Sequence, residues 1–200
     1  ICSEEATVAT PEAVIEIGST GVRLLVAEFT SDGNRNVLDR AEMPVSLGRD
    51  VFTTGIISRE TQALCLHVLS RYKEQLSGWG IVPSNTTVIA TSAFREAKNK
   101  DPVMDKILSS TGFRVTVIDG IEENRLMYMA VTDILKKEDV KFGSEDTVIL
   151  EVGGGSTEMM LMKKGRMVGA HSLRLGTVRL EAKMKSSAEP LTDVRSYIEE

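Results

Sequence analysis

The chain repeats one of its own segments. VIEIGSTGVRLLV begins at Val14, and ILEVGGGSTEMML begins at Ile149. Laid over each other without a gap, the two segments place Glu16 on Glu151. Each has an apolar run, a turn of small residues and a second apolar run, which is typical of strand–turn–strand structure. The repeat therefore predicts two copies of one supersecondary unit.

The hydrophobic pattern along the rest of the chain predicts an α/β fold. For the first copy it predicts strands at Ala13–Gly18, Val22–Phe29 and Asn36–Val45, a loop with Gly48 and Gly55, a helix after Ser58, a strand at Thr86–Thr91, a helix beginning at Asp101-Pro102, a strand at Arg114–Asp119 and a helix at Ile121–Lys137. For the second copy it predicts strands at Thr147–Val152, Thr157–Met162 and Arg166–Leu175, followed by helices at Thr177–Lys185 and Leu191–Glu200.

The element order divides the chain into one complete unit and part of another. The complete unit is expected over residues 12–138, with the order β-β-β-α-β-α-β-α. The start of the second unit is expected over residues 144–200, with a boundary near Lys136–Ser144. Because the second copy stops after its first helices, the chain is expected to be cut short relative to the protein it came from.

Charge and cysteine usage exclude several classes of protein. The net charge of -5 provides no basic field for a nucleic-acid backbone, so no nucleic-acid partner is expected. No apolar run reaches the length of a membrane span, so no membrane partner is expected either. Two cysteines, Cys2 and Cys65, cannot build a disulfide framework, which favours a reducing, cytoplasmic compartment. His67 and His171 are far apart in sequence and no cysteine pairs with either of them, so zinc is not expected.

The repeated turns favour a phosphate site. A turn of small residues leaves backbone N–H groups free to converge on an anion, and glycine lets phosphate oxygens approach closely. The carboxylate near each strand end, Glu16 or Glu151, can hold Mg²⁺ against those oxygens. A single such turn is more often an ordinary hairpin. Two copies, one of them EVGGGSTE, favour a phosphate clamp between two units.

The chain also resembles a known family through five motifs in order. They are AVIEIGSTGVRLLVAEF, ATSAFREAKN, IDGIEENRLMYMAV, EVGGGSTE and SLRLGTVRL. Their order and spacing are similar to those of the exopolyphosphatase / guanosine pentaphosphate phosphatase family. That family belongs to the superfamily of actin-like ATPases, sugar kinases and Hsp70. The resemblance covers the chain from about Ala13 to Leu180 and implies an actin-like (ribonuclease H-like) fold.

The resemblance implies an activity and a set of site residues. It implies hydrolysis of a terminal phosphoryl group from inorganic polyphosphate or guanosine pentaphosphate, with Mg²⁺, between two actin-like domains. A homodimer is a separate expectation for the full-length protein, and the sequence itself does not show the oligomeric state. By motif position, the phosphate loops are Gly18, Ser19 and Thr20, and Gly153, Gly154, Gly155 and Ser156, and the metal or water-positioning residues are Glu16, Glu151 and Glu158. The catalytic residues are Arg95, which would pair with a phosphate, and Glu123 or Glu122 as the base.

Which glutamate acts as the base stays open between Glu122 and Glu123, with Glu123 favoured. Without the resemblance, both glutamates would be interpreted as acidic residues that stabilise a helix N-terminus. Arg95 would be interpreted as a surface charge in a polar run. A carboxylate that deprotonates water typically contributes about 10²–10⁴-fold to a rate, which is the role that the resemblance implies here.

Two departures from the family pattern leave other functions open. The family usually has Asp where this chain has Glu16 and Glu151, and its first loop usually reads Ser-Asn-Ser where this chain has Ser19-Thr20-Gly21. Glutamate keeps the charge but is one methylene longer, which changes where metal and water can sit. One alternative is a sensor that binds polyphosphate or guanosine polyphosphates without hydrolysing them. Another is an ATP-dependent kinase or ATPase of the same superfamily.

Overall fold

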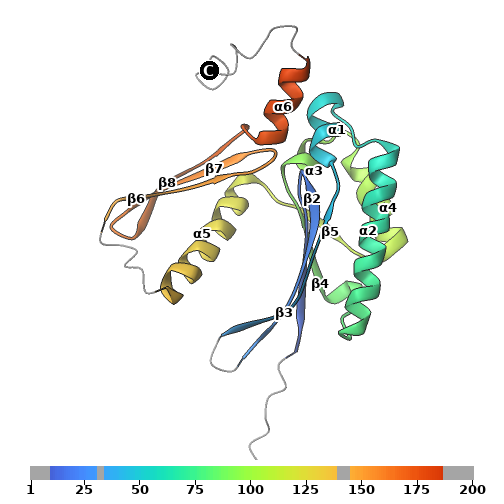
Figure 1. Cartoon of the computed structure of the whole chain (residues 1–200), viewed down its shortest axis with the longest axis horizontal. Coiled ribbons are helices and arrows are strands. Elements are labelled where there is room, and N and C mark those ends of the chain that lie inside the picture. The colour runs from blue at the N-terminus through green and yellow to red at the C-terminus, as the bar shows by residue number, and fades with distance from the viewer. Residues whose placement is uncertain (1–9, 31–33, 139–144, 187–200) are drawn as a thin grey trace, which may run out of the picture.

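A computed structural model describes residues 10–30, 34–138 and 145–186. Its first sheet has five strands in the order β3-β2-β1-β4-β5 (Figure 1). These strands are β1 (Glu12–Ile17), β2 (Gly21–Phe29), β3 (Arg35–Pro44), β4 (Thr86–Ala90) and β5 (Val115–Val117). β1, β2 and β3 form an antiparallel meander, and β4 and β5 extend the sheet in parallel from β1. The predicted α/β order of the first unit is thereby confirmed.

Two long helices cover one face of this sheet. They are α2 (Arg59–Gly78) and α4 (Lys100–Thr111), and a short 3₁₀ turn at Pro83–Asn85 leads into β4. Alternate residues of the central strands point toward them, as expected for a sheet with one face in a core. Ile15, Ile17 and Val22 are fully buried there against Leu69 and Ile107.

The second sheet is smaller and antiparallel. It contains β6 (Thr147–Val152), β7 (Thr157–Lys163) and β8 (Arg166–Leu173) in that order. The long helix α5 (Gly120–Lys137) packs against β7 and β8 (Figure 1). By chain order α5 belongs to the predicted first unit, but by its contacts it lies on the second sheet. The predicted boundary near Lys136–Ser144 stays a prediction.

Two helices connect the units. α6 (Thr177–Ser186) follows the second sheet and packs against α1 (Leu47–Thr54), which follows the first (Figure 1). The predicted loop between Gly48 and Gly55 is therefore wrong, because Leu47 and Val51 are buried on one face of a helical turn there. Gly55 ends α1 in the left-handed conformation that glycine adopts without strain. The predicted helix at Leu191–Glu200 lies outside the described residues.

Two other helical boundaries differ from the prediction. A short helix, α3 (Ser92–Glu96), follows β4 directly. α4 begins at Lys100 and not at Asp101-Pro102 as predicted, so Asp101 lies inside the helix and does not cap it. The Asn99 side chain does not cap α4 either, because it exchanges hydrogen bonds with the backbone of Ile57. Pro102 still lies in the first turn, where its missing N–H costs no helical bond.

The buried thiol of Cys65 allows a test of this core. Cys65 lies on α2 at 1% exposure, and burial raises its pKa to about 12. Since the thiolate is the reactive form, we expect no alkylation by iodoacetamide in the folded protein at pH 8. Unfolding in guanidinium should restore full labelling. A Cys2→Ser variant removes the other thiol, and rapid labelling of that folded variant would contradict the core described above.

Among the described residues, the structure contains no helix whose length and apolar character would let it cross a membrane.

Candidate active site

The two repeated turns close in the same way. In the first, the N–H of Gly18 donates to the carbonyl of Gly21 at 2.9 Å. In the second, the N–H of Gly153 donates to the carbonyl of Ser156, also at 2.9 Å. The sequence repeat is therefore a repeat of hydrogen bonding as well.

At each turn, backbone N–H groups from the start of a helix donate hydrogen bonds to carbonyl groups of the turn. Gly48, in the first turn of α1, donates its N–H to the carbonyl of Ser19 at 2.7 Å. Thr177 and Val178, at the start of α6, donate to the carbonyls of Gly153 and Gly154 at 3.0 and 2.9 Å. Within the part of the chain that the structure describes, the N–H groups of Ser19 and Thr20 and those of residues 154–156 have no protein acceptor. These N–H groups are available to an anion.

The two turns lie directly against each other. A Cβ on Gly155 would come within 2.2 Å of the Ser92 Oγ and 2.7 Å of the Ser19 Oγ. A Cβ on Gly154 would lie 3.0 Å from a methyl carbon of Thr20. The Ser19 and Ser92 hydroxyls share a 3.0 Å hydrogen bond in the buried layer beneath. Glycine at position 155 is thus required by space.

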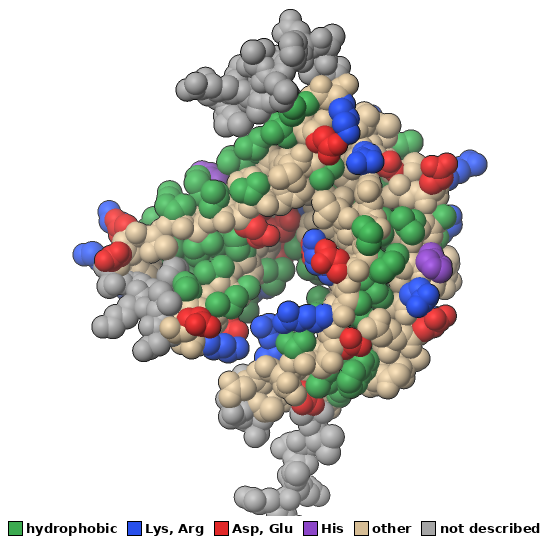
Figure 2. Space-filling model, in the orientation of Figure 1, with side chains coloured by type: hydrophobic (Ala, Val, Ile, Leu, Met, Phe, Trp, Pro, Cys, Tyr) green, Lys and Arg blue, Asp and Glu red, His purple; other side chains and the backbone are tan. Residues whose placement is uncertain are grey.

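A cavity of about 680 Å³ opens between the two units beside these turns. Figure 2 shows the hollow from outside, with acidic and basic side chains at its rim. Most of the predicted site residues line it: Glu16, Gly18, Ser19, Thr20, Glu123, Glu151, Gly153, Gly154, Gly155, Ser156 and Glu158. Arg95 and Glu122 do not.

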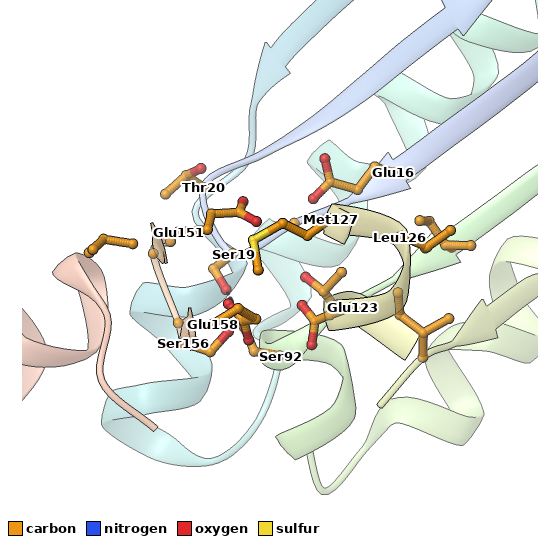
Figure 3. Close-up of a pocket in the computed structure, with 18 of the residues that line it drawn as sticks. Glu16, Ser19, Thr20, Ser92, Glu123, Leu126, Met127, Glu151, Ser156 and Glu158 are labelled. Atoms are coloured by element: carbon orange, nitrogen blue, oxygen red, sulfur yellow. Dashed lines mark hydrogen bonds between the residues drawn. The ribbon is translucent and has the colours of Figure 1, made fainter. Parts of the chain in front are cut away.

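Four carboxylates from four elements surround this cavity. Figure 3 shows Glu16 from β1, Glu123 from α5, Glu151 from β6 and Glu158 from β7. Glu16 and Glu151 stand at the turn ends of corresponding strands. Glu158 is buried and accepts a 2.9 Å hydrogen bond from the Ser172 hydroxyl. The site therefore concentrates negative charge opposite the free N–H groups of the turns.

Glu123 has the environment of a general base. Asp119 caps α5 by accepting a hydrogen bond from the N–H of Glu122. Glu123 lies in the first turn of this helix, and its side chain lines the cavity. Burial raises the pKa of Glu123 above its ordinary value, the Arg95 guanidinium lowers it, and the nearby carboxylates of Glu158 and Glu151 raise it further, leaving it elevated. A carboxyl with a raised pKa is a better proton acceptor.

Glu122 lies outside the site. Its side chain points to solvent and forms two 2.7 Å hydrogen bonds with Arg125. These bonds lower the pKa of Glu122 below its ordinary value. The structure therefore distinguishes the adjacent glutamates by their surroundings, and only Glu123 faces the cavity.

Arg95 contacts Glu123 and lies outside the phosphate cavity. Its Nη1 donates to the Glu123 Oε2 at 2.6 Å and to the Ile118 carbonyl at 2.7 Å. Its side chain lines a neighbouring cavity of about 570 Å³ with Asn124 and Ser172. Arg95 therefore orients the carboxylate of Glu123, and its predicted pairing with a phosphate stays a prediction.

The carboxylates suit a magnesium ion that shares its coordination with substrate. Burial, then the neighbouring charges of Glu158 and Glu16, raise the pKa of Glu151, so a cation there would relieve repulsion. Among the described ranges, no three His, Cys, Asp or Glu side chains are grouped to hold a metal by themselves. Mg²⁺ often binds through one or two carboxylates plus waters and substrate phosphates, which is the arrangement that this donor set permits.

Comparison with known proteins agrees with the geometry. The sequence profile of the Ppx/GppA phosphatase family matches residues 25–198. The chain belongs to this family. The fold is that of the crystal structure of the Aquifex aeolicus family member, with a TM-score of 0.72 at 28% identity over 94% of this chain. An exopolyphosphatase structure from Cytophaga hutchinsonii has the same fold, with a TM-score of 0.80 at 24% identity. The predicted family and actin-like fold are confirmed.

The curated relatives are longer than this chain. A bifunctional 3-dehydroquinate synthase/phosphatase of Fusobacterium nucleatum is 31% identical over 86% of this chain and 26% of its own length. Exopolyphosphatase 1 of Mycobacterium leprae is 26% identical over 84% of this chain and 47% of its own length. The chain spans 58% of the Aquifex aeolicus Ppx/GppA family structure.

Reasoning from the sequence missed two residues of this site, Ser92 and Gly48. Ser92 lies in the ATSAFREAKN motif, but its buried hydroxyl under the turns could not be placed without the fold. Gly48 could have been found, because Leu47-Gly48 after the first meander corresponds to Leu175-Gly176 after the second. Both glycines begin a helix that contacts its own turn, and a Cβ on Gly176 would lie 2.5 Å from the Gly154 carbonyl oxygen.

Proposed function

We propose that this protein hydrolyses the terminal phosphoryl group of inorganic polyphosphate or of guanosine pentaphosphate in the cavity between its two units. The observation that carries the proposal is the position of Glu123, a partly buried carboxylate with a raised pKa that lines the same cavity as two turns with free N–H groups. Relatives named exopolyphosphatase support the substrate class.

The chain's own groups divide the reaction between them. The N–H groups of the two turns bind the non-bridging oxygens of the terminal phosphate and stabilise charge in the transition state. Arg95 holds the Oε2 of Glu123, and among the described residues Oε1 has no hydrogen-bond donor. Oε1 can therefore accept a proton from a water molecule while the oxygen of that water forms a bond to the phosphorus atom. The bridging P–O bond breaks, and orthophosphate and the shortened chain leave.

One or two of the cavity carboxylates Glu151, Glu16 and Glu158 would hold Mg²⁺ together with waters and substrate oxygens, and the ion would neutralise phosphate charge. We expect phosphate release from long-chain polyphosphate by the full-length protein to stop when EDTA removes Mg²⁺ and to return when Mg²⁺ is restored. Colorimetric detection of orthophosphate measures this directly. Release that is equally fast in EDTA would contradict the metal assignment.

The same assay separates the proposed function from its alternatives. Guanosine pentaphosphate and ATP are tested beside polyphosphate. One specific observation favours a sensor. The carboxylate of Glu16, which lines the cavity, forms an ion pair with Arg23, with 3.0 Å between Oε2 and Nη1. Tight polyphosphate binding without turnover, unrescued in the Glu16→Asp plus Glu151→Asp variant, would establish that alternative. Turnover of ATP alone would indicate a kinase or ATPase.

A further inference from the structure

A buried arginine from α6 lies beneath the second turn. Arg179 is 8% exposed, and its Nε donates to the carbonyl of Gly155 at 2.7 Å. Its guanidinium carbon lies 4.1 Å from the centre of the Phe52 ring, on α1 of the other unit. Arg179 therefore contacts the turn of its own unit and a helix of the opposite unit at once.

The remaining donors of Arg179 bind an acidic residue of the first unit. Its Nη1 and Nη2 donate to the two carboxylate oxygens of Glu96 at 3.0 and 2.5 Å. Glu96 is the last residue of α3, the helix that begins with Ser92. Paired donors of this kind give a rigid geometry, because the guanidinium fork matches the carboxylate. The pair therefore fixes α6 to the element that carries the Ser92 hydroxyl.

The bond from Arg179 completes a series along the turn. The carbonyls of Gly153 and Gly154 accept from backbone N–H groups at the start of α6, and the Gly155 carbonyl accepts from the Arg179 side chain. Three consecutive carbonyls are thus held by one helix. The N–H groups of residues 154–156 are the groups left for a ligand, in a turn that has no spare room around Gly155.

We propose that Arg179 is a positioning residue for the phosphate site, which holds the second turn in place against the first unit through Gly155, Glu96 and Phe52. It touches no substrate itself. Its effect on turnover rests on the proposed function above, whereas its effect on the turn does not. A lysine could keep the charge but could not reproduce the fork and the Nε bond together.

Arg174 provides a matched control. It also donates to Glu96, at 2.6 Å, but its side chain is 76% exposed and, among the described residues, it makes no hydrogen bond to the turn. In the full-length protein, we expect Arg179→Gln and Arg179→Lys to speed amide hydrogen exchange at Gly153, Thr177 and Val178, whose N–H groups donate to carbonyls of the second turn, while the rest of both sheets stays protected. We expect kcat for phosphate release to fall by about 10²-fold, as for a site displaced by about 1 Å. Arg174→Gln should change neither measurement by more than about twofold, as is usual for exposed ion pairs.

Three outcomes decide the proposal. Added guanidinium that partly restores turnover to Arg179→Ala, but does nothing for Arg174→Ala, supports positioning. Faster exchange throughout the protein with a lowered Tm shows a general structural role and overturns the proposal, as does unchanged exchange at Gly153, Thr177 and Val178. If the wild-type protein releases no phosphate, the proposed function fails, but the local exchange of the turn still decides the role of Arg179.

Discussion

Glu123→Gln is expected to lower the rate of phosphate release by about 10²–10⁴-fold, the usual contribution of a general base. Glutamine has nearly the same shape, and its amide can still meet Arg95, but it cannot accept a proton from water. The loss should therefore appear in kcat, with little change in KM. Steady-state release of orthophosphate from polyphosphate measures both constants.

The neighbouring Glu122→Gln is the matched control for this prediction. It removes the same charge one residue away, from a side chain that is paired with Arg125 in solvent. We expect its kcat to stay within about twofold of wild type, since exposed pairs of this kind contribute little. Equal losses in the two variants, or undiminished release by Glu123→Gln, would show that the base lies elsewhere.

The choice between these glutamates shows how far sequence reasoning reached. Adjacent residues on a helix point about 100° apart, so only one of Glu122 and Glu123 could face the site. The sequence favoured Glu123 through resemblance, but the direction of α5 depends on its packing against β7 and β8. That packing joins segments far apart in the chain, which no local pattern encodes.

The turns were more predictable than the groups around them. Glycine spacing and flanking carboxylates are local features, and the repeat placed Glu16 and Glu151 at corresponding strand ends, where the structure has them. The partner of Arg95 was not predictable, because Glu123 follows it only after another helix and strand. The helix at Leu47–Thr54 was missed because glycines at both ends of a short segment usually indicate a loop.

Gly155→Ala is expected to cause the second large effect, because the two turns have no room for a methyl group between them. The added carbon would lie 2.2 Å from the Ser92 Oγ and 2.7 Å from a ring carbon of Phe52. Ser92 is buried and Phe52 is partly buried and packed against the core, so the turn itself must move. We expect a loss of about 1–3 kcal/mol in the free energy of unfolding, as for overpacked cores, measured by urea denaturation.

The same movement should weaken phosphate binding, since it displaces N–H groups that converge on one anion. Titration calorimetry with tripolyphosphate measures this at a temperature where the variant is folded. Gly78→Ala is the control, because Gly78 ends α2 with nothing within 4 Å of the added carbon. It should bind tripolyphosphate as wild type does and gain up to about 1 kcal/mol of stability from the helix propensity of alanine. If folded Gly155→Ala binds as tightly as wild type, the second turn is not part of the phosphate site, and the repeat of the two turns in the sequence would be a feature of folding alone.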